Sequence, residues 1–283
     1  MVLPMKKIVL LGHPLGHSFS PVMQNAAIAA AGLGGQLAYE AWDTSPEALG
    51  VVLLSMRSGE VVGANVTIPY KVEILRYLDG ISSDAQLMGA ANTLCMKDGR
   101  LLGYNTDGAG FLKALAESGV SADGRTAVVM GAGGAARAVA FSLARSGARE
   151  ITVANRDAGH AQALASEVSS KTKAAARAIG FDSLGPALAS AQLAVNCTPL
   201  GLKGLHENET PIPRGLLHPG LVVVDGVYNP RETLLLREAR EAGCRVVSGD
   251  GMLLHQGALG FKIWTGIDAP VDAMRTALAE AIA

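Results

Sequence analysis

Aromatic residues, cysteine and an excess of charge of either sign are all scarce in this chain of 283 residues. Aromatic side chains make up 4% of it, and 24 lysine and arginine residues nearly balance 25 aspartate and glutamate residues, which gives a net charge of -1 at pH 7. A near-neutral protein has no broad positive field to hold a phosphate backbone or an anionic membrane. We therefore expect neither nucleic acid nor a membrane as a partner.

Only three cysteines are present, Cys95, Cys197 and Cys244, and they lie far apart in the sequence. An odd number without CxxC or metal-ligand spacing argues against a disulfide framework and against a structural zinc site. The six histidines show no spacing typical of a metal-dependent hydrolase. We predict reduced, buried thiols, a cytoplasmic location and no bound metal.

Long uninterrupted hydrophobic runs are also missing near the N-terminus. Lys6 and Lys7 precede only the apolar run of residues 8–11, which Gly12 ends, and this is too short for a signal peptide or a membrane span. Hydrophobic residues nevertheless make up 49% of the chain and charged residues 17%. This composition can bury a sizeable core, in one large domain or in two smaller ones.

Short β-branched runs alternate with alanine-rich segments of helical spacing. Such runs, when Gly, Asn or Asp ends them, are typical of strands covered on both faces. Alternation of strands and helices predicts an α/β fold of βαβ units with a mostly parallel sheet. The polar segment 117–124 is the best candidate for a flexible linker. A helix from about Asp107 is expected to connect the two halves of the chain. The predicted strands cover residues 7–11, 126–130, 151–154 and 221–224, and the predicted helices residues 21–31, 135–145, 157–168 and 232–241.

A glycine-rich loop lies between a predicted strand and a predicted helix in the second half of the chain. Gly131-Ala-Gly-Gly-Ala-Ala136 matches G-x-G-x-x-A and directly follows the strand 126–130. The first glycine permits a tight turn, the second lets the backbone approach a pyrophosphate, and the small Ala136 allows close packing of helix on strand. The loop predicts a dinucleotide site; the alternative is a glycine-rich turn without a ligand.

The next predicted strand ends in Asn155-Arg156-Asp157. An NAD enzyme normally carries an acid here to bind the ribose 2′-hydroxyl, whereas arginine suits a 2′-phosphate. Arg156 therefore favours NADP and Asp157 opposes it, so NAD stays possible as a coenzyme. We expect Arg156 to prevail, because Asp157 can turn to solvent or cap the following helix. The alternative interpretation of Arg156 is a solvated surface cation.

Polar side chains also follow the predicted strands of the first half. Ser18 and Ser20 stand at the C-terminal edge of a sheet, where α/β folds bind ligands, and two hydroxyls could hold a carboxylate. Ser20 before Pro21 has the pattern of a helix N-cap, and the pattern alone favours capping. A lone lysine at a helix start, such as Lys71, is more often solvated than catalytic. Further amide and hydroxyl groups cluster in residues 65–71, 92–93 and 105–108.

Taken together, these motifs resemble those of the shikimate/quinate dehydrogenase family. They occur in the family's order and span nearly the whole chain. The matching segments are Gly12 to Pro21, Asn65-Val-Thr-Ile-Pro-Tyr-Lys71, Asn92-Thr93, Asn105-Thr-Asp-Gly108, Gly131 to Ala136, Asn155-Arg156, Asn196-Cys-Thr-Pro199, Asp225-Gly-Val-Tyr228 and Gly251-Met-Leu-Leu-His-Gln256.

The resemblance implies an oxidoreductase of the shikimate pathway that interconverts shikimate and 3-dehydroshikimate by hydride transfer, with NADP as coenzyme and NAD possible. It implies two domains with the active site in the cleft between them. An N-terminal α/β substrate domain would comprise residues 1–106 and 250–283, and a Rossmann-like NADP-binding domain would comprise residues 107–249. The nearest alternatives are quinate or an amino analogue as substrate. A non-catalytic, cofactor-binding regulatory protein is the alternative of another class, and the protein would be a monomer or a homodimer.

The resemblance also implies roles for individual residues. Lys71 and Asp107 would form the catalytic pair. The substrate-binding residues would be Ser18, Ser20, Asn65, Thr67, Lys71, Asn92, Asp107, Tyr228 and Gln256. The cofactor-binding residues would be Gly131, Ala132, Gly133, Gly134, Ala135, Asn155, Arg156, Asp157, Asn196, Thr198, Leu202, Val227, Gly249 and Met252.

The chain departs from the family pattern at a few positions. Gln24 stands where the family usually has histidine, and Asp157 stands where threonine is common. Cys197 and Leu202 replace the more usual alanine and methionine. His255 occupies a usually apolar position, and we expect it to be a packed core residue.

Overall fold

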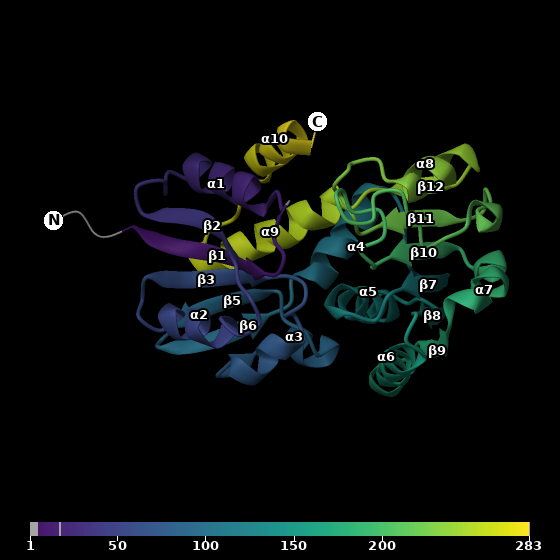
Figure 1. Cartoon of the computed structure of the whole chain (residues 1–283), viewed down its shortest axis with the longest axis horizontal. Coiled ribbons are helices and arrows are strands. Elements are labelled where there is room, and N and C mark those ends of the chain that lie inside the picture. The colour runs from purple at the N-terminus through teal and green to yellow at the C-terminus, as the bar shows by residue number, and fades with distance from the viewer. Residues whose placement is uncertain (1–4, 17, 283) are drawn as a thin grey trace. The chain divides into compact units, whose positions relative to one another are not determined.

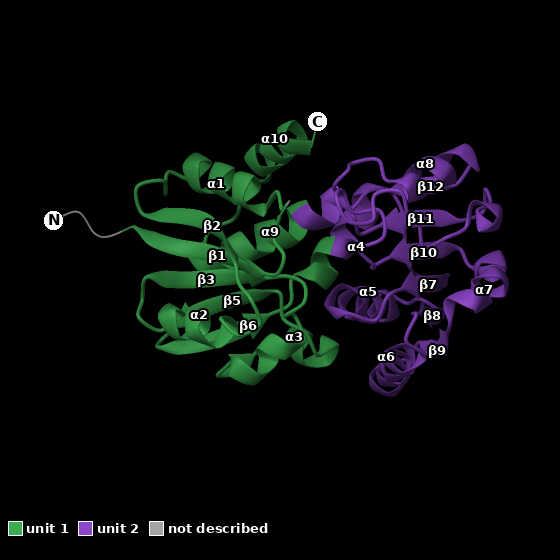
Figure 2. Ribbon diagram, viewed as in Figure 1, with its two compact units in different colours: residues 1–110, 254–283 green, residues 111–253 purple. Residues whose placement is uncertain are grey.

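The structure of the protein, a computed structural model, describes residues 5–16 and 18–282 (Figure 1). The chain divides into two compact units (Figure 2): unit 1 comprises residues 1–110 and 254–283, and unit 2 comprises residues 111–253. Each unit is built around its own six-stranded sheet. Within the described residues, no helix is long and apolar enough to cross a membrane. His17, inside the motif from Gly12 to Pro21, lies outside the described residues.

Unit 1 contains a mixed sheet with the strand order β2-β1-β3-β5-β6-β4. The first three strands are parallel, β5 runs antiparallel to β3 and β6, and β4 is parallel to β6. The strands are β1 (Lys6–Gly12), β2 (Leu37–Asp43), β3 (Val61–Val66), β4 (Gly80–Ile81), β5 (Thr93–Lys97) and β6 (Arg100–Tyr104). The helices are α1 (Ser20–Ala30), α2 (Leu49–Met56), η1 (Glu73–Tyr77) and α3 (Ser83–Met88).

The end of the chain completes unit 1. The helix α9 (Asp250–Thr265) begins in the last residues of unit 2 and continues into unit 1. The helix α10 (Val271–Ile282) comes after it and packs against α1. Trp264 of α9 donates from Nε1 to the carbonyl oxygen of Leu94 on β5 at 2.8 Å. Its indole also lies so close to Gly63 on β3 that a Cβ atom there would be 2.3 Å from it. Only glycine at position 63 therefore leaves room for the tryptophan.

The core of unit 1 shows why the short apolar runs form strands. Leu49, Leu53 and Met56 of α2 recur on one helical face and are buried against alternate residues of the sheet such as Val9 and Leu11. Burial of such side chains gains roughly 25 cal/mol for each Å² of apolar surface removed from water. The sheet of unit 1 is thus held from the side of α2 by apolar packing.

Unit 2 contains a parallel sheet with the strand order β12-β11-β10-β7-β8-β9. Numbered within the unit, this is the doubly wound order of dinucleotide-binding proteins, and the expected α/β architecture is confirmed. The strands are β7 (Thr126–Met130), β8 (Glu150–Ala154), β9 (Ala175–Ile179), β10 (Leu193–Asn196), β11 (Val222–Asp225) and β12 (Arg245–Val247). The helix α4 (Asp107–Glu117) begins in unit 1 and continues into unit 2. The other helices of unit 2 are α5 (Gly134–Arg145), α6 (Ala158–Lys171), η2 (Phe181–Ser183), α7 (Leu184–Ser190), η3 (Arg214–Leu216) and α8 (Leu234–Glu241).

The strands of unit 2 are buried on both faces, as the continuous apolar runs predict. Val128, Met130 and Val223 pack in one cluster with Leu188 of α7 and Leu235 of α8. The intervening strand residues are buried as well. Because the sheet is parallel, the carboxyl ends of β7, β8, β10 and β11 meet at one edge.

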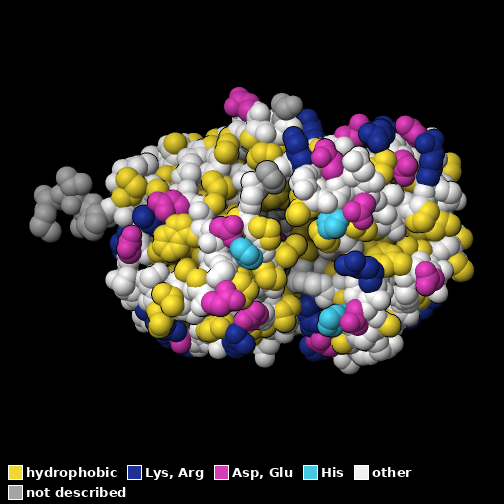
Figure 3. All heavy atoms as spheres, viewed as in Figure 1, with side chains coloured by type: hydrophobic (Ala, Val, Ile, Leu, Met, Phe, Trp, Pro, Cys, Tyr) yellow, Lys and Arg dark blue, Asp and Glu magenta, His cyan; other side chains and the backbone are white. Residues whose placement is uncertain are grey.

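Charged side chains are distributed without segregation of sign. On the face shown in Figure 3, lysine and arginine side chains alternate with aspartate and glutamate side chains over both units. Several form exposed pairs, such as Arg57 with Asp79 at 2.8 Å and Arg177 with Glu150 at 2.8 Å. Exposed pairs of this kind contribute little to stability, about 0–1 kcal/mol each.

Candidate active site

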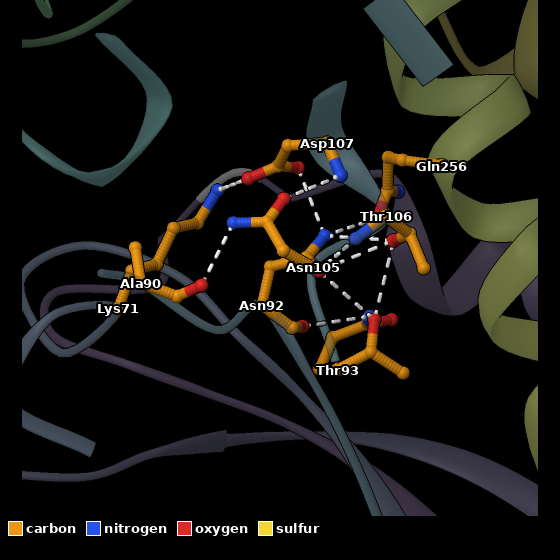
Figure 4. Close-up of polar contacts among 9 residues, drawn as sticks. Lys71, Ala90, Asn92, Thr93, Asn105, Thr106, Asp107 and Gln256 are labelled. Carbon is orange, nitrogen blue, oxygen red and sulfur yellow. Dashed lines mark hydrogen bonds and ion pairs between the residues drawn. The ribbon is translucent and has the colours of Figure 1, made fainter. Parts of the chain in front are cut away.

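Lys71 and Asp107 form a close ion pair in unit 1. Lys71 follows β3 and Asp107 begins α4, and the Nζ atom donates to Oδ2 at 2.6 Å (Figure 4). Their side chains are 14% and 4% exposed. A carboxylate in the first helical turn also gains from the positive end of the helix dipole. The structure therefore brings together the two residues expected to form the catalytic pair.

Asn92 joins this pair to α9. Its Nδ2 atom lies 2.9 Å from Asp107 Oδ1 and 3.2 Å from Gln256 Oε1 (Figure 4). Its Oδ1 atom accepts from the backbone N–H of Thr106 at 2.8 Å. The Asn105 side chain completes this part of the network, accepting from Asp107 N at 3.1 Å and donating to the Ala90 carbonyl at 2.9 Å. Residues far apart in the sequence thus meet around one carboxylate.

Asn65 extends the network along β3. Its Nδ2 atom donates to Thr93 Oγ1 at 3.2 Å and to the Asn92 carbonyl at 3.1 Å. Its Oδ1 atom accepts from the hydroxyl of Tyr39 at 2.7 Å, which fixes the orientation of the amide. Tyr39 was not among the residues that the motifs indicated. The available signal was an aromatic residue with a polar tip inside an apolar segment, because a buried tyrosine hydroxyl usually finds a partner.

The two serines expected at a carboxylate lie at the start of α1. The helix begins at Ser20, and its N-cap residue is Phe19, which makes no side-chain cap hydrogen bond. The interpretation of Ser20 as the N-cap is therefore wrong, because the helix starts one residue earlier than the serine-proline pattern indicates. Ser18 Oγ accepts from Ser20 N at 3.2 Å. Within the described residues, the Ser20 and Thr67 hydroxyls make no hydrogen bond and can bind a ligand.

The departure at Gln24 has a structural explanation. Gln24 is 1% exposed, and its Nε2 atom donates to the Gly257 carbonyl at 3.0 Å. Gly257 directly follows Gln256, so this bond ties α1 to the part of α9 that reaches the network. His255 is 1% exposed, and its expected place in the core is confirmed.

The glycine loop of unit 2 has the geometry that a pyrophosphate requires. Gly131 adopts a φ of 107°, and a Cβ atom there would lie 3.1 Å from the Cys197 carbonyl oxygen. Gly133 is the N-cap of α5, and no atom lies within 4 Å of the position of a Cβ atom there. The first turn of α5 has no acidic residue and no side-chain cap. Within the described residues, no side chain therefore occupies the first N–H groups of α5 or opposes its positive dipole, which fits a dinucleotide phosphate.

The end of β8 carries the residues expected to select the coenzyme. Asp157 is the N-cap of α6, with Oδ1 accepting from His160 N at 2.9 Å. The pKa of Asp157 is lowered by this backbone hydrogen bond and by the charge of His160. The expectation that Asp157 can cap the helix is confirmed. Arg156 is exposed and makes no hydrogen bond or ion pair within the described part of the chain, so its guanidinium is available to an anion.

The remaining expected cofactor residues lie in unit 2 near the carboxyl ends of its strands or in the turns that follow. Asn196, the last residue of β10, is 0% exposed, and its Oδ1 atom accepts from Thr198 N at 2.9 Å and from Thr198 Oγ1 at 2.7 Å. Tyr228 also belongs to unit 2, unlike the other expected substrate-binding residues. Among these expected ligand-binding residues of unit 2, the buried ones are Gly131, Asn196, Val227 and Gly249. The half-buried ones are Ala132, Gly134, Ala135, Asn155, Thr198, Leu202, Tyr228 and Met252.

The cysteines differ in burial. Cys95 and Cys244 are buried, as expected, whereas Cys197 is only half-buried, because it leaves β10 in the turn next to Gly131. Burial raises the pKa of the Cys95 and Cys244 thiols. Within residues 5–16 and 18–282, no group of three or more histidine, cysteine, aspartate or glutamate residues is placed to hold a metal ion.

Three family models match successive parts of the chain. The model described as "Shikimate dehydrogenase substrate binding domain" matches residues 10–94. The model described as "Shikimate / quinate 5-dehydrogenase" matches residues 114–209. The model described as "Shikimate 5'-dehydrogenase C-terminal domain" matches residues 249–279.

Individual relatives match over nearly the whole chain. The NADP(+) shikimate dehydrogenase of Symbiobacterium thermophilum is 46% identical, over 99% of this chain and 95% of the relative. A crystal structure of a shikimate dehydrogenase in complex with NADP+ superposes with a TM-score of 0.91 at 42% identity, covering 99% of this chain and 96% of that one. The Thermus thermophilus shikimate 5-dehydrogenase in complex with NADP(H) and shikimate has a TM-score of 0.86 at 41% identity, covering 98% and 100%.

A relative named for a different substrate, quinate, has a similar structure but a lower sequence identity. The quinate dehydrogenase of Corynebacterium glutamicum in complex with NAD has a TM-score of 0.88 at 32% identity, covering 98% of this chain and 99% of that one. Family models and full-length relatives thus agree with the motifs and with the two sheets. The chain belongs to the shikimate dehydrogenase family.

Proposed function

We propose that the protein is an NADP-dependent shikimate dehydrogenase, which interconverts shikimate and 3-dehydroshikimate. The observation that carries the proposal is the Lys71–Asp107 pair at 2.6 Å, set in a buried network of amides and hydroxyls. A cofactor-binding regulatory protein would need the nucleotide-binding loop but not this pair. The relatives named as NADP(+) shikimate dehydrogenases support the same reaction.

The mechanism assigns proton transfer to Lys71. The nicotinamide coenzyme, when bound, would supply the hydride acceptor for oxidation or the hydride donor for reduction. In oxidation the substrate hydroxyl must lose its proton, and Lys71 takes it in the neutral amine form and becomes an ammonium group. In reduction the Lys71 ammonium group gives a proton to the carbonyl oxygen and becomes the neutral amine. Asp107 holds the Lys71 amine in one orientation through the 2.6 Å bond. Asn92 in turn holds the Asp107 carboxylate from its other oxygen.

Binding and orientation are assigned to the residues around this pair. We assign the substrate carboxylate to Ser18 and Ser20 and, as the family resemblance implies, to Tyr228. The ring hydroxyls bind Asn65, Thr67, Asn92, Asp107 and Gln256. Holding the carbinol carbon in the reactive orientation lowers the activation free energy by several kcal/mol, and by about 7–11 kcal/mol in the most favourable intramolecular reactions.

The coenzyme is assigned to unit 2. The free N–H groups of α5 beyond Gly133 would bind the pyrophosphate, and Arg156 would bind the 2′-phosphate. Thr198, Leu202, Val227, Gly249 and Met252 would lie along the nicotinamide half. We assign residues 1–106 and 250–283 to the substrate domain and residues 107–249 to the NADP domain.

A kinetic comparison tests the proposal. Purified protein is incubated with shikimate or quinate, each with NADP or NAD, and formation of the reduced coenzyme is followed by absorbance. We expect the highest kcat/KM for shikimate with NADP. A higher kcat/KM for quinate would assign the protein to the quinate branch of the family, and coenzyme binding without turnover of either acid would indicate a regulatory protein.

The proposal includes a cytoplasmic monomer or homodimer that binds small molecules only. The three cysteines support the location, because they form no disulfide in the structure and stay compatible with a reducing compartment. Light scattering of the purified protein distinguishes the two oligomeric states.

A further inference from the structure

Asp225 is a buried carboxylate to which the mechanism gives no role. It ends β11 and is 0% exposed. Its Oδ1 atom accepts from Asn196 Nδ2 at 2.8 Å and from Val227 N at 3.0 Å, and its Oδ2 atom accepts from Thr233 Oγ1 at 2.6 Å. No cation pairs with it within the described residues. The three donors come from the end of β10, the turn after β11 and the N-cap of α8.

The ionised form of Asp225 is costly for the protein. Burial raises its pKa to about 6, against the opposing effects of the hydrogen bonds from Thr233, Val227 and Asn196. A buried charge without an opposite charge is unfavourable even when it is hydrogen-bonded. The free energy of unfolding therefore gives no reason for a carboxylate at this position. The three hydrogen-bond donors that converge on its two oxygen atoms do give a reason.

Each donor orders a segment at the carboxyl edge of the unit 2 sheet. Asn196 holds Thr198 through two hydrogen bonds and also donates to the Leu200 carbonyl at 3.1 Å. Val227 directly precedes Tyr228. Thr233 accepts from Leu236 N at 3.2 Å and so caps α8.

The backbone around Asp225 is packed too tightly to shift independently. A Cβ atom at Gly226 would lie 2.8 Å from the Asn196 carbonyl oxygen, and one at Gly249 would lie 2.7 Å from the Asp225 carbonyl oxygen. A change in the hydrogen bonds of one segment is therefore transmitted to its neighbours.

We propose that Asp225 is a positioning residue that holds the Thr198 loop (residues 197–202) and the Tyr228 turn (residues 226–230) in the arrangement that receives the coenzyme. The inference rests on the proposed function, because it assumes that this edge binds NADP. Asp225 itself touches neither coenzyme nor substrate in this role.

The carboxylate is required because it only accepts hydrogen bonds. Protonation, or an asparagine amide, places a donor at one of the two oxygen positions. At Oδ1 it opposes the donors of Asn196 and Val227, and at Oδ2 it makes the Thr233 hydroxyl accept instead of donate, so the set of three bonds changes in either case. The groups that face the carboxylate are the Asn196 amide, the Thr233 hydroxyl and the Val227 N–H, none of which titrates near neutral pH. Coenzyme affinity should therefore follow the ionisation of Asp225.

The test is Asp225→Asn, with binding of NADPH to the coenzyme-free protein measured by fluorescence titration. At about pH 7.5 we expect a dissociation constant roughly tenfold above that of the unmodified protein. The 2′-phosphate of the coenzyme also titrates near pH 6 and changes the affinity of both proteins. The quantity compared across pH is therefore the dissociation constant of Asp225→Asn divided by that of the unmodified protein. This ratio should fall toward one below about pH 6, where both proteins carry a neutral side chain.

Thermal unfolding provides a second measurement. The pKa in the folded protein lies above the ordinary value of 3.8, so the folded state binds the proton more tightly. The stability of the unmodified protein relative to Asp225→Asn should therefore decline as the pH rises from about 4 to about 6. A ratio of dissociation constants near one at every pH, with altered melting alone, would show that Asp225 has only a structural role.

Thr233 supplies a matched pair of variants if Asp225→Asn does not fold. Thr233→Ser keeps the hydroxyl that bonds Asp225 and caps α8, whereas Thr233→Val removes it. We expect weaker NADPH binding in the valine variant than in the serine variant, and equal binding would overturn the inference. Failure of the unmodified protein to bind NADPH would instead contradict the proposed function.

Discussion

Unit 1 and unit 2 build their expected ligand sites from different parts of the polypeptide. In unit 1 the site consists of side chains that bond one another, with Asn92 reaching both Asp107 and Gln256. In unit 2 the phosphate site consists of backbone, with Gly133 beside open space at the start of α5.

The difference matches the two ligands. A hydroxylated ring carboxylate offers donors and acceptors in fixed directions, and side chains held by their neighbours can select it. A pyrophosphate is the same in every dinucleotide, so backbone N–H groups suffice, and the proposed function assigns discrimination between coenzymes to the exposed Arg156. Side-chain substitutions should therefore damage unit 1 most, and steric changes at glycine should damage unit 2 most.

The largest effect should come from Lys71→Ala. Loss of a general acid–base group typically lowers the rate by about 10²–10⁴-fold, and we expect kcat to fall far more than KM rises. Lys97→Ala, at an exposed lysine at the end of β5, is the matched control and should be nearly neutral. Near-native kcat in Lys71→Ala would remove the lysine from the mechanism.

Next in size are Ser18→Ala and Ser20→Ala. Each loses a hydrogen bond to a charged group, worth roughly 1.5–3 kcal/mol, so KM for the substrate should rise while the dissociation constant of the coenzyme stays unchanged. Ser82→Ala is the control, because Ser82 is the N-cap of α3 and accepts from Ala85 N. It should lower the melting temperature and leave KM alone. The same pattern in the Ser18 and Ser20 variants would exclude carboxylate binding.

A matched pair of glycine substitutions examines the backbone site of unit 2. The Cβ atom of Gly133→Ala meets no atom of the protein within 4 Å. The free energy of unfolding should therefore change by less than about 1 kcal/mol, while the dissociation constant of NADP rises roughly tenfold. Gly131→Ala instead forces alanine to a φ of 107° and should destabilise the fold itself. Unchanged coenzyme binding in Gly133→Ala would contradict the backbone site.

The smallest effect concerns coenzyme choice. Arg156→Ala should raise KM for NADP and leave KM for NAD unchanged, since it removes one charge-assisted bond that solvent screens, worth up to about 1 kcal/mol. Asp157→Thr keeps a side chain that can cap α6 and should strengthen the preference for NADP. We expect a modest preference in the unmodified protein, with measurable NAD activity. Exclusive use of NAD, with Arg156→Ala indifferent, would show that Asp157 dominates.

Short continuous apolar runs and alanine-rich segments of helical spacing made parts of the fold predictable. The strand predicted at residues 126–130 has the observed bounds, and the helix predicted at residues 135–145 begins one residue earlier. The strands β4 and β12 contain only two and three residues. Periodicity cannot identify segments of that length, because pairing with a neighbouring strand rather than local preference makes them extended.

The site was predictable only in part, and for a different reason. The motifs named Lys71, Asp107 and Gln256, but their assembly depends on the path of the chain between them. Tyr39 was missed because its partner Asn65 lies on another strand. The capping role of Ser20 was wrong because local pattern does not fix the first helical residue.

The contact of Trp264 with Gly63 has a consequence for the order of folding. Unit 2 is one continuous stretch, residues 111–253. Unit 1 instead needs a tryptophan from the last thirty residues to fill the space above Gly63 and to bond Leu94. We therefore expect residues 1–110 to complete their packing only after α9 has been synthesised, although they are the first part of the two units to be made.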